Sequence, residues 1–267
     1  MKRLLAFGLL CTAQCVFAGA FAIFPLDIFR NDRETRRVPD GVDIRWTVRL
    51  GGCTGSMLSP RYMLSAAHCG VAVGDRMTSG GCLALGCTRD LTVTRIVEHS
   101  EIFDSVIAEV SWSRIDSRWK QRYTPRVQIT ENQIELGRDD QATRLFTVGF
   151  PTDKNGAMLA TGFAKEIRGN GMRYNIGIIN GNSGGAVWTW DDYMLVSQTN
   201  NGPHNFGQPG WNNNDPENPR AWNGGPAIYK MYAQSKTLKE VYPTGRNYNV
   251  SFEGFLIRDD VMPPLDP

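Results

Sequence analysis

The chain has 267 residues, of which 41% are apolar and 21% are charged, and its formal net charge is +2. A chain of this length and composition can bury one large core or two modest ones. The charge excess is carried by Lys2 and Arg3, because without them 27 basic residues face 27 acidic ones. Nothing in this balance favours nucleic acid or an anionic membrane as a partner.

Residues 1–20 have the pattern of a secretory signal peptide. Two basic residues precede an apolar stretch over residues 4–18, and Ala18-Gly19-Ala20 provides a small-residue cleavage site. The stretch is too short and too interrupted for a membrane span. We therefore predict cleavage after Ala20 and an exported protein, secreted or periplasmic, without a stable membrane anchor.

Residues 21–40 are charged and show no sustained period. They form either a short pro-segment that ends near Arg36-Arg37 or an N-terminal arm that crosses the fold, and the sequence leaves both open.

Period-two alternation of apolar and polar residues begins at residues 44–50 and is typical of a strand with one buried face. Clusters of Gly, Asn, Asp and Pro separate further short segments of this kind. Such spacing without intervening helices predicts an all-β protein, an antiparallel barrel or sandwich. The further predicted strands are 62–66, 91–97, 106–110, 145–150, 158–167, 186–190, 194–199 and 227–231.

The C-terminal third differs in composition. Residues 200–225 are rich in Asn, Pro and Gly, which predicts a long surface loop. A helix is expected over residues 233–241, and residues 243–267 form a tail with one more strand candidate at 248–257.

Four cysteines remain after signal removal, and four cysteines allow three pairings. We predict the disulfides Cys53–Cys69 and Cys82–Cys87, which export makes chemically reasonable. Zinc is the alternative, but the spacings do not form two close pairs and an oxidising compartment disfavours thiolate ligands. We therefore expect no metal and no cofactor.

Ser183 lies in the glycine-rich segment GNSGG, residues 181–185. A serine hydroxyl attacks a carbonyl only if a base removes its proton and fixed donors receive the negative charge that develops on the carbonyl oxygen. Glycines allow successive N–H groups to point into one concavity. Alone, this pattern is more often a simple turn than a catalytic one.

A base and an acid complete the candidate site. His68 is the second-last residue of the segment YMLSAAHC, and small residues there allow the imidazole to face a cleft. The acid must be buried and must hold the imidazole in one tautomer. Asp104 heads the apolar run FDSVIAEV, and Ser105 could support it. Other acids compete for this role: Glu98, Glu101 and Glu109.

Three segments together resemble the chymotrypsin-like (trypsin-like) serine proteases: CTGSMLSPRYMLSAAHC at 53–69, FDSVIAEV at 103–110 and GNSGGAVW at 181–188. TVGFPTDKNG at 147–156 is similar to a stretch of the bacterial glutamyl endopeptidases, and residues 226–241 resemble the last strand and terminal helix of the animal enzymes. The resemblance covers roughly residues 40–242. It implies two packed six-stranded antiparallel β-barrels with a C-terminal helix, the first over 41–125 and the second over 126–242.

The resemblance also implies the chemistry. His68 would take the proton of Ser183 and Asp104 would orient His68, while the N–H groups of Gly181 and Ser183 would form the oxyanion hole and an acyl-enzyme would form on Ser183. One departure is Asn182, where most members have an aspartate that pairs with a newly released N-terminus.

By the family pattern, Gly177 lies at the base of the substrate pocket, followed by Ile178. No acid is present there to bind Lys or Arg. Ala227 would line a wall, and Gln198 stands where the glutamyl endopeptidases have a histidine. We therefore predict an uncharged, small to medium P1 side chain.

The predicted function is an exported serine endopeptidase with a protein or peptide substrate. Two alternatives remain: a protease-fold binding protein without catalysis, and an esterase of the same fold.

Overall fold

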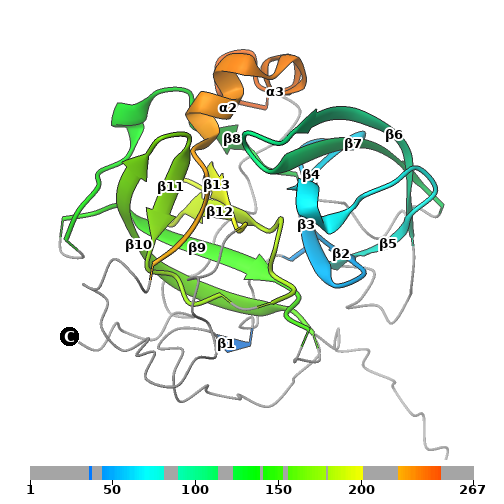
Figure 1. Cartoon of the computed structure of the whole chain (residues 1–267), viewed down its shortest axis with the longest axis horizontal. Helices are drawn as coiled ribbons and strands as arrows, with labels where there is room; N and C mark the ends of the chain where they lie inside the picture. Colours follow the sequence, from blue (N-terminus) through cyan, green and yellow to red (C-terminus); the bar gives the residue numbers. More distant parts are fainter. Residues whose placement is uncertain are drawn as a thin grey trace, which may run out of the picture.

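The structure is a computed structural model, and it describes residues 36–37, 44–80, 90–113, 123–138, 141–152, 156–178, 180–200 and 222–247. The predicted signal peptide, the Cys82–Cys87 pair, most of the 200–225 loop and the strand candidate at 248–257 lie outside these residues. Two β units lie side by side with two short helices at one end (Figure 1).

The first unit is a closed antiparallel barrel of six strands in the order β2-β3-β4-β7-β6-β5. Alternating apolar side chains fill its interior, including those of Val48, Met63 and Leu91. Pairing of β4 with β7 places Ala66 opposite Ser105, so the end of β4 lies beside the start of β7. The strands are β2 (Thr47–Leu50), β3 (Cys53–Met57), β4 (Tyr62–Ala66), β5 (Arg76–Ser79), β6 (Leu91–Ser100) and β7 (Ser105–Trp112).

The second unit is an eight-stranded sheet in the order β14-β11-β10-β9-β12-β13-β8, with β1 paired to β10. After β13, the amide of Asn200 donates to the carbonyl of Gly224 at 3.0 Å, which brings the chain back to β14. The strands are β1 (Arg36–Arg37), β8 (Arg126–Val127), β9 (Arg144–Gly149), β10 (Met158–Arg168), β11 (Gly171–Tyr174), β12 (Ala186–Thr189), β13 (Met194–Gln198) and β14 (Asn223–Pro226). The predicted all-β class is confirmed.

Two helices follow β14, α2 (Ile228–Gln234) and α3 (Lys236–Val241). The strand predicted over residues 227–231 is therefore wrong. The buried residues of α2 are Ile228 and Met231, three positions apart, as on one face of a helix. The last strand is instead β14, whose first residues fall in the stretch predicted as a loop. Two short 3₁₀ turns are η1 (Ala67–Cys69) and η2 (Glu131–Gln133).

A shared aromatic core joins the two units. Trp46, just before β2, stacks on Trp188 of β12 with ring centroids 5.1 Å apart, and Trp188 stacks on Phe146 of β9 at 5.4 Å. The helices bind the first barrel as well, because Glu98 Oε1 accepts a hydrogen bond from the amide of Thr237 at 2.7 Å. The two units are thus held in a fixed relation to each other.

None of the helices in the described part of the chain has the length and apolar character needed to cross a membrane.

Candidate active site

His68 lies on η1, directly after the fully buried strand β4. The turn ends at Gly70, whose φ of 66° is the left-handed conformation that glycine adopts without strain. The disulfide between Cys53 and Cys69 fixes the turn to the start of β3, which confirms this predicted pair. The imidazole is thereby placed at the end of a rigid strand.

Asp104 immediately precedes β7, and its φ is 44°, a conformation that short polar side chains tolerate better than most. Its Oδ2 lies 2.6 Å from Nδ1 of His68, and its Oδ1 accepts from the His68 amide at 2.9 Å. The backbone adds a third tie, since the amide of Ala67 donates to the Asp104 carbonyl at 3.1 Å. One carboxylate therefore fixes both the ring and the main chain of His68.

The acid is less buried than the sequence predicts. The side chain of Asp104 is 31% exposed and that of His68 is 44% exposed. Both groups are therefore reached by solvent, and hydrogen bonds rather than burial hold the carboxylate in place.

Asn200, which directly follows Thr199 at the end of β13, is a residue that sequence reasoning missed. Its Nδ2 donates to Asp104 Oδ2 at 3.1 Å and to the Asp104 carbonyl at 2.6 Å. Ser105, which was expected to support the acid, has a buried hydroxyl with no hydrogen-bond partner among the described residues. The support for Asp104 thus comes from the second unit.

Ser183 lies on the turn between β11 and β12. Its carbonyl accepts from the amide of Thr54 at 2.8 Å, which binds the turn to β3 of the first barrel. Gly184 allows this close approach: its φ is 85°, and a Cβ there would lie 2.3 Å from Ser65 Oγ and from the Thr54 carbonyl. The contact between the two units therefore requires a glycine at position 184.

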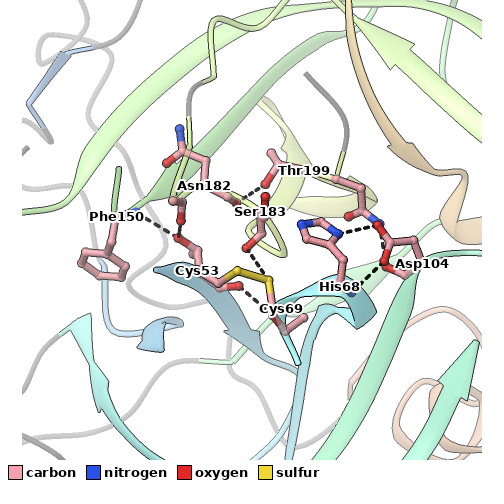
Figure 2. The surroundings of a disulfide bond; sticks show 12 residues. Cys53, His68, Cys69, Asp104, Phe150, Asn182, Ser183 and Thr199 are labelled. Atoms are coloured by element: carbon pink, nitrogen blue, oxygen red, sulfur yellow. Dashed lines mark hydrogen bonds and ion pairs between the residues drawn. A yellow bond between two sulfur atoms is a disulfide. The ribbon is translucent and has the colours of Figure 1, made fainter. Parts of the chain in front are cut away.

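Figure 2 shows the three predicted residues together. The imidazole of His68 lies between Asp104 and Ser183, and its ring edge opposite Asp104 faces Ser183. The Ser183 hydroxyl makes no hydrogen bond to another described residue. The structure therefore brings together His68 and Asp104 from the first barrel and Ser183 from the second unit.

No protein-family model matches the sequence, and no curated protein matches it. Solved structures do match. A Glu endopeptidase in complex with MPD is 17% identical with a TM-score of 0.53, and the match covers 75% of this chain and 96% of the other. Kallikrein-related peptidase 10 in complex with Zn²⁺ is 14% identical with a TM-score of 0.51 and coverages of 76% and 97%, and human heparin binding protein is 13% identical with a TM-score of 0.54 and coverages of 80% and 96%. The chain has the chymotrypsin-like fold. At these identities the likeness concerns the fold alone.

In this chymotrypsin-like fold the disulfide lies beside the turn that holds Ser183. Cys69 Sγ is 3.6 Å from the Ser183 carbonyl oxygen. The two sulfur atoms and His68 lie close enough together to suggest a metal site. However, each sulfur is bonded to the other and neither is a thiolate, so this group lacks the ligands that zinc requires.

The four predicted pocket residues all belong to the second unit. Ile178 and Ala227 pack in one apolar cluster with Tyr174, and they are 7% and 0% exposed. Gln198 is fully buried, and its Nε2 donates to the Asp104 carbonyl at 3.3 Å. Gly177 is partly exposed. Gln198 thus contacts the acid rather than solvent.

Asn182 is 3% exposed, and its Oδ1 has no hydrogen-bond partner among the described residues. It packs against β9 so closely that a Cβ at Gly149 would lie 2.3 Å from this oxygen. The side chain is therefore enclosed next to Ser183 but bears no charge.

Proposed function

We propose that the chain is a serine endopeptidase in which Ser183 is the nucleophile, His68 the general base and Asp104 the group that orients His68. The observation that carries this proposal is the 2.6 Å contact between His68 Nδ1 and Asp104 Oδ2, with Ser183 at the opposite edge of the ring. Three residues far apart in the chain meet here in the order that acyl transfer requires.

The tautomer follows from the hydrogen bond. An ionised carboxylate only accepts, so the proton of neutral His68 resides on Nδ1 and Nε2 keeps its lone pair. Nε2 takes the proton of Ser183 as Oγ attacks the peptide carbonyl, and it returns that proton to the leaving amine. Water then enters by the same route and releases the acyl group from Ser183.

The negative charge on the carbonyl oxygen needs donors that are already in position. The amides of Gly181 and Ser183 are the proposed pair, and no described backbone carbonyl accepts from either of them. Removing one such donor in an enzyme of this type costs about 2.7–4 kcal/mol of barrier.

The P1 preference rests on the composition of the proposed pocket. Gly177 and Ile178 supply no charge to pair with Lys or Arg, and the amide of Gln198 is engaged by Asp104. We propose an uncharged, small to medium P1 residue. Ala227, which was predicted to line a wall, is 0% exposed and does not reach this pocket. A peptide-library profile dominated by Arg, Lys or Glu at P1 would refute this preference.

Export is proposed from the sequence of residues 1–20, and the Cys53–Cys69 disulfide supports it because such bonds persist in oxidising compartments. The mature chain would then act outside the cytoplasm on proteins or peptides. N-terminal sequencing of the purified exported protein tests the cleavage after Ala20.

A binding protein of the same fold is the second candidate. One of the matching structures, heparin binding protein, is named for binding rather than catalysis. The distinction lies in the nucleophile, and an organophosphorus fluoride tests it directly. We expect the probe to label wild-type protein and not Ser183→Ala, whereas folded wild-type protein that stays unlabelled supports the binding function. Cleavage of casein by labelling-competent protein then separates the endopeptidase from an esterase.

A further inference from the structure

The turn that holds Ser183 is fixed by two buried threonines, one from each unit. Thr54 of β3 and Thr199, just after β13, are both 0% exposed. The hydroxyl of Thr54 donates to the Gly181 carbonyl at 2.8 Å, and the hydroxyl of Thr199 donates to the Asn182 carbonyl. Figure 2 shows Thr199 directed at the turn beside Ser183. The two side chains therefore hold consecutive carbonyl groups.

The hydroxyl of Thr54 has a defined orientation. Its oxygen accepts from the amide of Phe150 at 3.0 Å, so its own hydrogen is directed to the Gly181 carbonyl. The backbone of Thr54 adds the bond from its amide to the Ser183 carbonyl at 2.8 Å. One residue of the first barrel thus binds the turn on both sides of Asn182.

Peptide planarity converts these bonds into orientations of N–H groups. In a trans peptide the N–H of one residue points opposite to the carbonyl of the preceding residue, and the described chain contains no cis peptide bond. Holding the Asn182 carbonyl, which also accepts from the Gly185 amide at 2.9 Å, therefore fixes the Ser183 N–H. Holding the Gly181 carbonyl prevents rotation of the peptide that lies between the two amides of the proposed oxyanion hole.

We propose that Thr54 and Thr199 are positioning residues that preorganise the oxyanion hole through their hydroxyl groups. This inference rests on the proposed function and deepens it, because it assigns the preorganisation of the turn to neutral side chains from both units. Neither residue touches the substrate. They keep two N–H groups aimed at one point before the substrate binds. Donors that are already in position stabilise the transition state without reorganisation during the reaction.

The test compares Thr54→Val and Thr199→Val with Thr54→Ser. Valine keeps the shape of threonine and removes the hydroxyl, while serine keeps the hydroxyl and removes a methyl group. We expect each valine variant to lower kcat by about 10- to 100-fold and to change KM by less than about threefold, since the hole acts in the transition state. Thr54→Ser should stay within about threefold of wild type in kcat.

Thr47→Val is the matched control. Thr47 is also fully buried in the first barrel, and its hydroxyl donates to the Ile44 carbonyl at 2.6 Å, away from the turn. It should lose stability as Thr54→Val does and keep the kcat of wild type. An equal fall in kcat for the control would overturn the proposal, as would valine variants with unchanged kcat. If Thr54→Val does not fold, Thr199→Val and Thr54→Ser decide by the same criteria.

The rate of Ser183 labelling by an organophosphorus fluoride separates this proposal from the proposed function. Wild-type protein that labels on Ser183, with the valine variants labelling at least about tenfold more slowly, supports both, because the phosphoryl oxygen uses the same donors. Wild type and valine variants that label equally fast overturn only the threonine proposal. Folded wild-type protein that does not label overturns both.

Discussion

Asn200→Leu is the substitution that most sharply separates orientation of the acid from stability of the fold. Leucine nearly matches asparagine in shape, so the main change is loss of the amide. Asn200 Nδ2 donates to Asp104 Oδ2 at 3.1 Å and to the Asp104 carbonyl at 2.6 Å. After the substitution, the carbonyl keeps the Ala67 amide and the carboxylate keeps His68.

In Asn200→Leu the expected loss of stability is partly compensated, whereas the expected loss of activity is not. Loss of the bond to the charged carboxylate costs about 1.5–3 kcal/mol. Loss of each of the two neutral bonds, to the carbonyls of Asp104 and Phe103, costs about 0.5–1.5 kcal/mol. Asn200 Oδ1 is buried without a partner among the described residues, and removing such an orphaned acceptor recovers about 1–3 kcal/mol. Taken at the middle of each range, these contributions leave a net loss of about 2 kcal/mol in the free energy of unfolding.

Activity has no such compensation. Losing about 1.5 kcal/mol of carboxylate orientation in the transition state corresponds to a roughly tenfold fall in kcat. We would measure kcat on a peptide substrate and the free energy of unfolding by urea titration, for Asn200→Leu and for wild type. Unchanged kcat would refute the role of Asn200. A fall in kcat that scales with a large loss of stability would assign it to packing instead.

Three further predictions concern stability. Replacing Cys53 and Cys69 together by alanine should lower the free energy of unfolding by about 3 kcal/mol, as expected for a loop of 16 residues. Urea titration of the oxidised wild type and of the variant measures this loss, and equal midpoints would contradict the prediction. Glu109 accepts hydrogen bonds from two arginines, Arg61 first among them, which hold its pKa below the ordinary value of 4.5. Since the pKa of Glu109 is depressed in the folded protein, wild type should be more stable than Glu109→Gln above pH 4.5, and this advantage should fade as the pH falls below that value. Thermal melts of both proteins from pH 7 to pH 3 measure the advantage, and a difference in Tm that stays constant with pH would contradict the prediction. Gly225→Ala should destabilise by about 1–3 kcal/mol or more, because its Cβ would lie 1.6 Å from a backbone oxygen of β13, whereas Gly171→Ala, whose Cβ meets nothing closer than 3.4 Å, is the control.

The sequence predicts the three central residues because each stands in a distinctive local pattern. His68 follows a buried strand and precedes a cysteine, Asp104 heads an apolar run, and Ser183 lies among glycines. These local patterns survive folding because strand ends and tight turns are set by nearby residues. What joins the three residues is the pairing of β4 with β7 and the contact of Gly184 with the first barrel, which no local pattern reveals.

The supporting residues could not be found in this way. Asn200 begins a long stretch rich in Asn, Pro and Gly, where nothing distinguishes one amide from the next. Thr54 is a small polar residue between a cysteine and a glycine, and its partners are 96 and 127 positions away in the chain. Hydrogen bonds of this separation depend on how the two units pack together.

The error at residues 227–231 has a similar origin. Ala227, Tyr229 and Met231 satisfy a period of two, so the segment matches a strand pattern as well as a helical one. The glycines of β14 conceal the true strand. Gly225 lies close to β13 and Gly224 close to β11, so side chains are excluded where apolar residues would otherwise mark the strand. Tertiary contacts decide between the two patterns.

The central claim is that His68, Asp104 and Ser183 act as one catalytic unit across the two β units. Measuring kcat for Ser183→Ala, His68→Ala and the double variant tests it most directly. Residues that act together lose activity non-additively, so we expect each single variant to lose nearly all activity and the double variant to lose little more. Additive losses in the double variant, or a folded His68→Ala that retains the kcat of wild type, would contradict the claim.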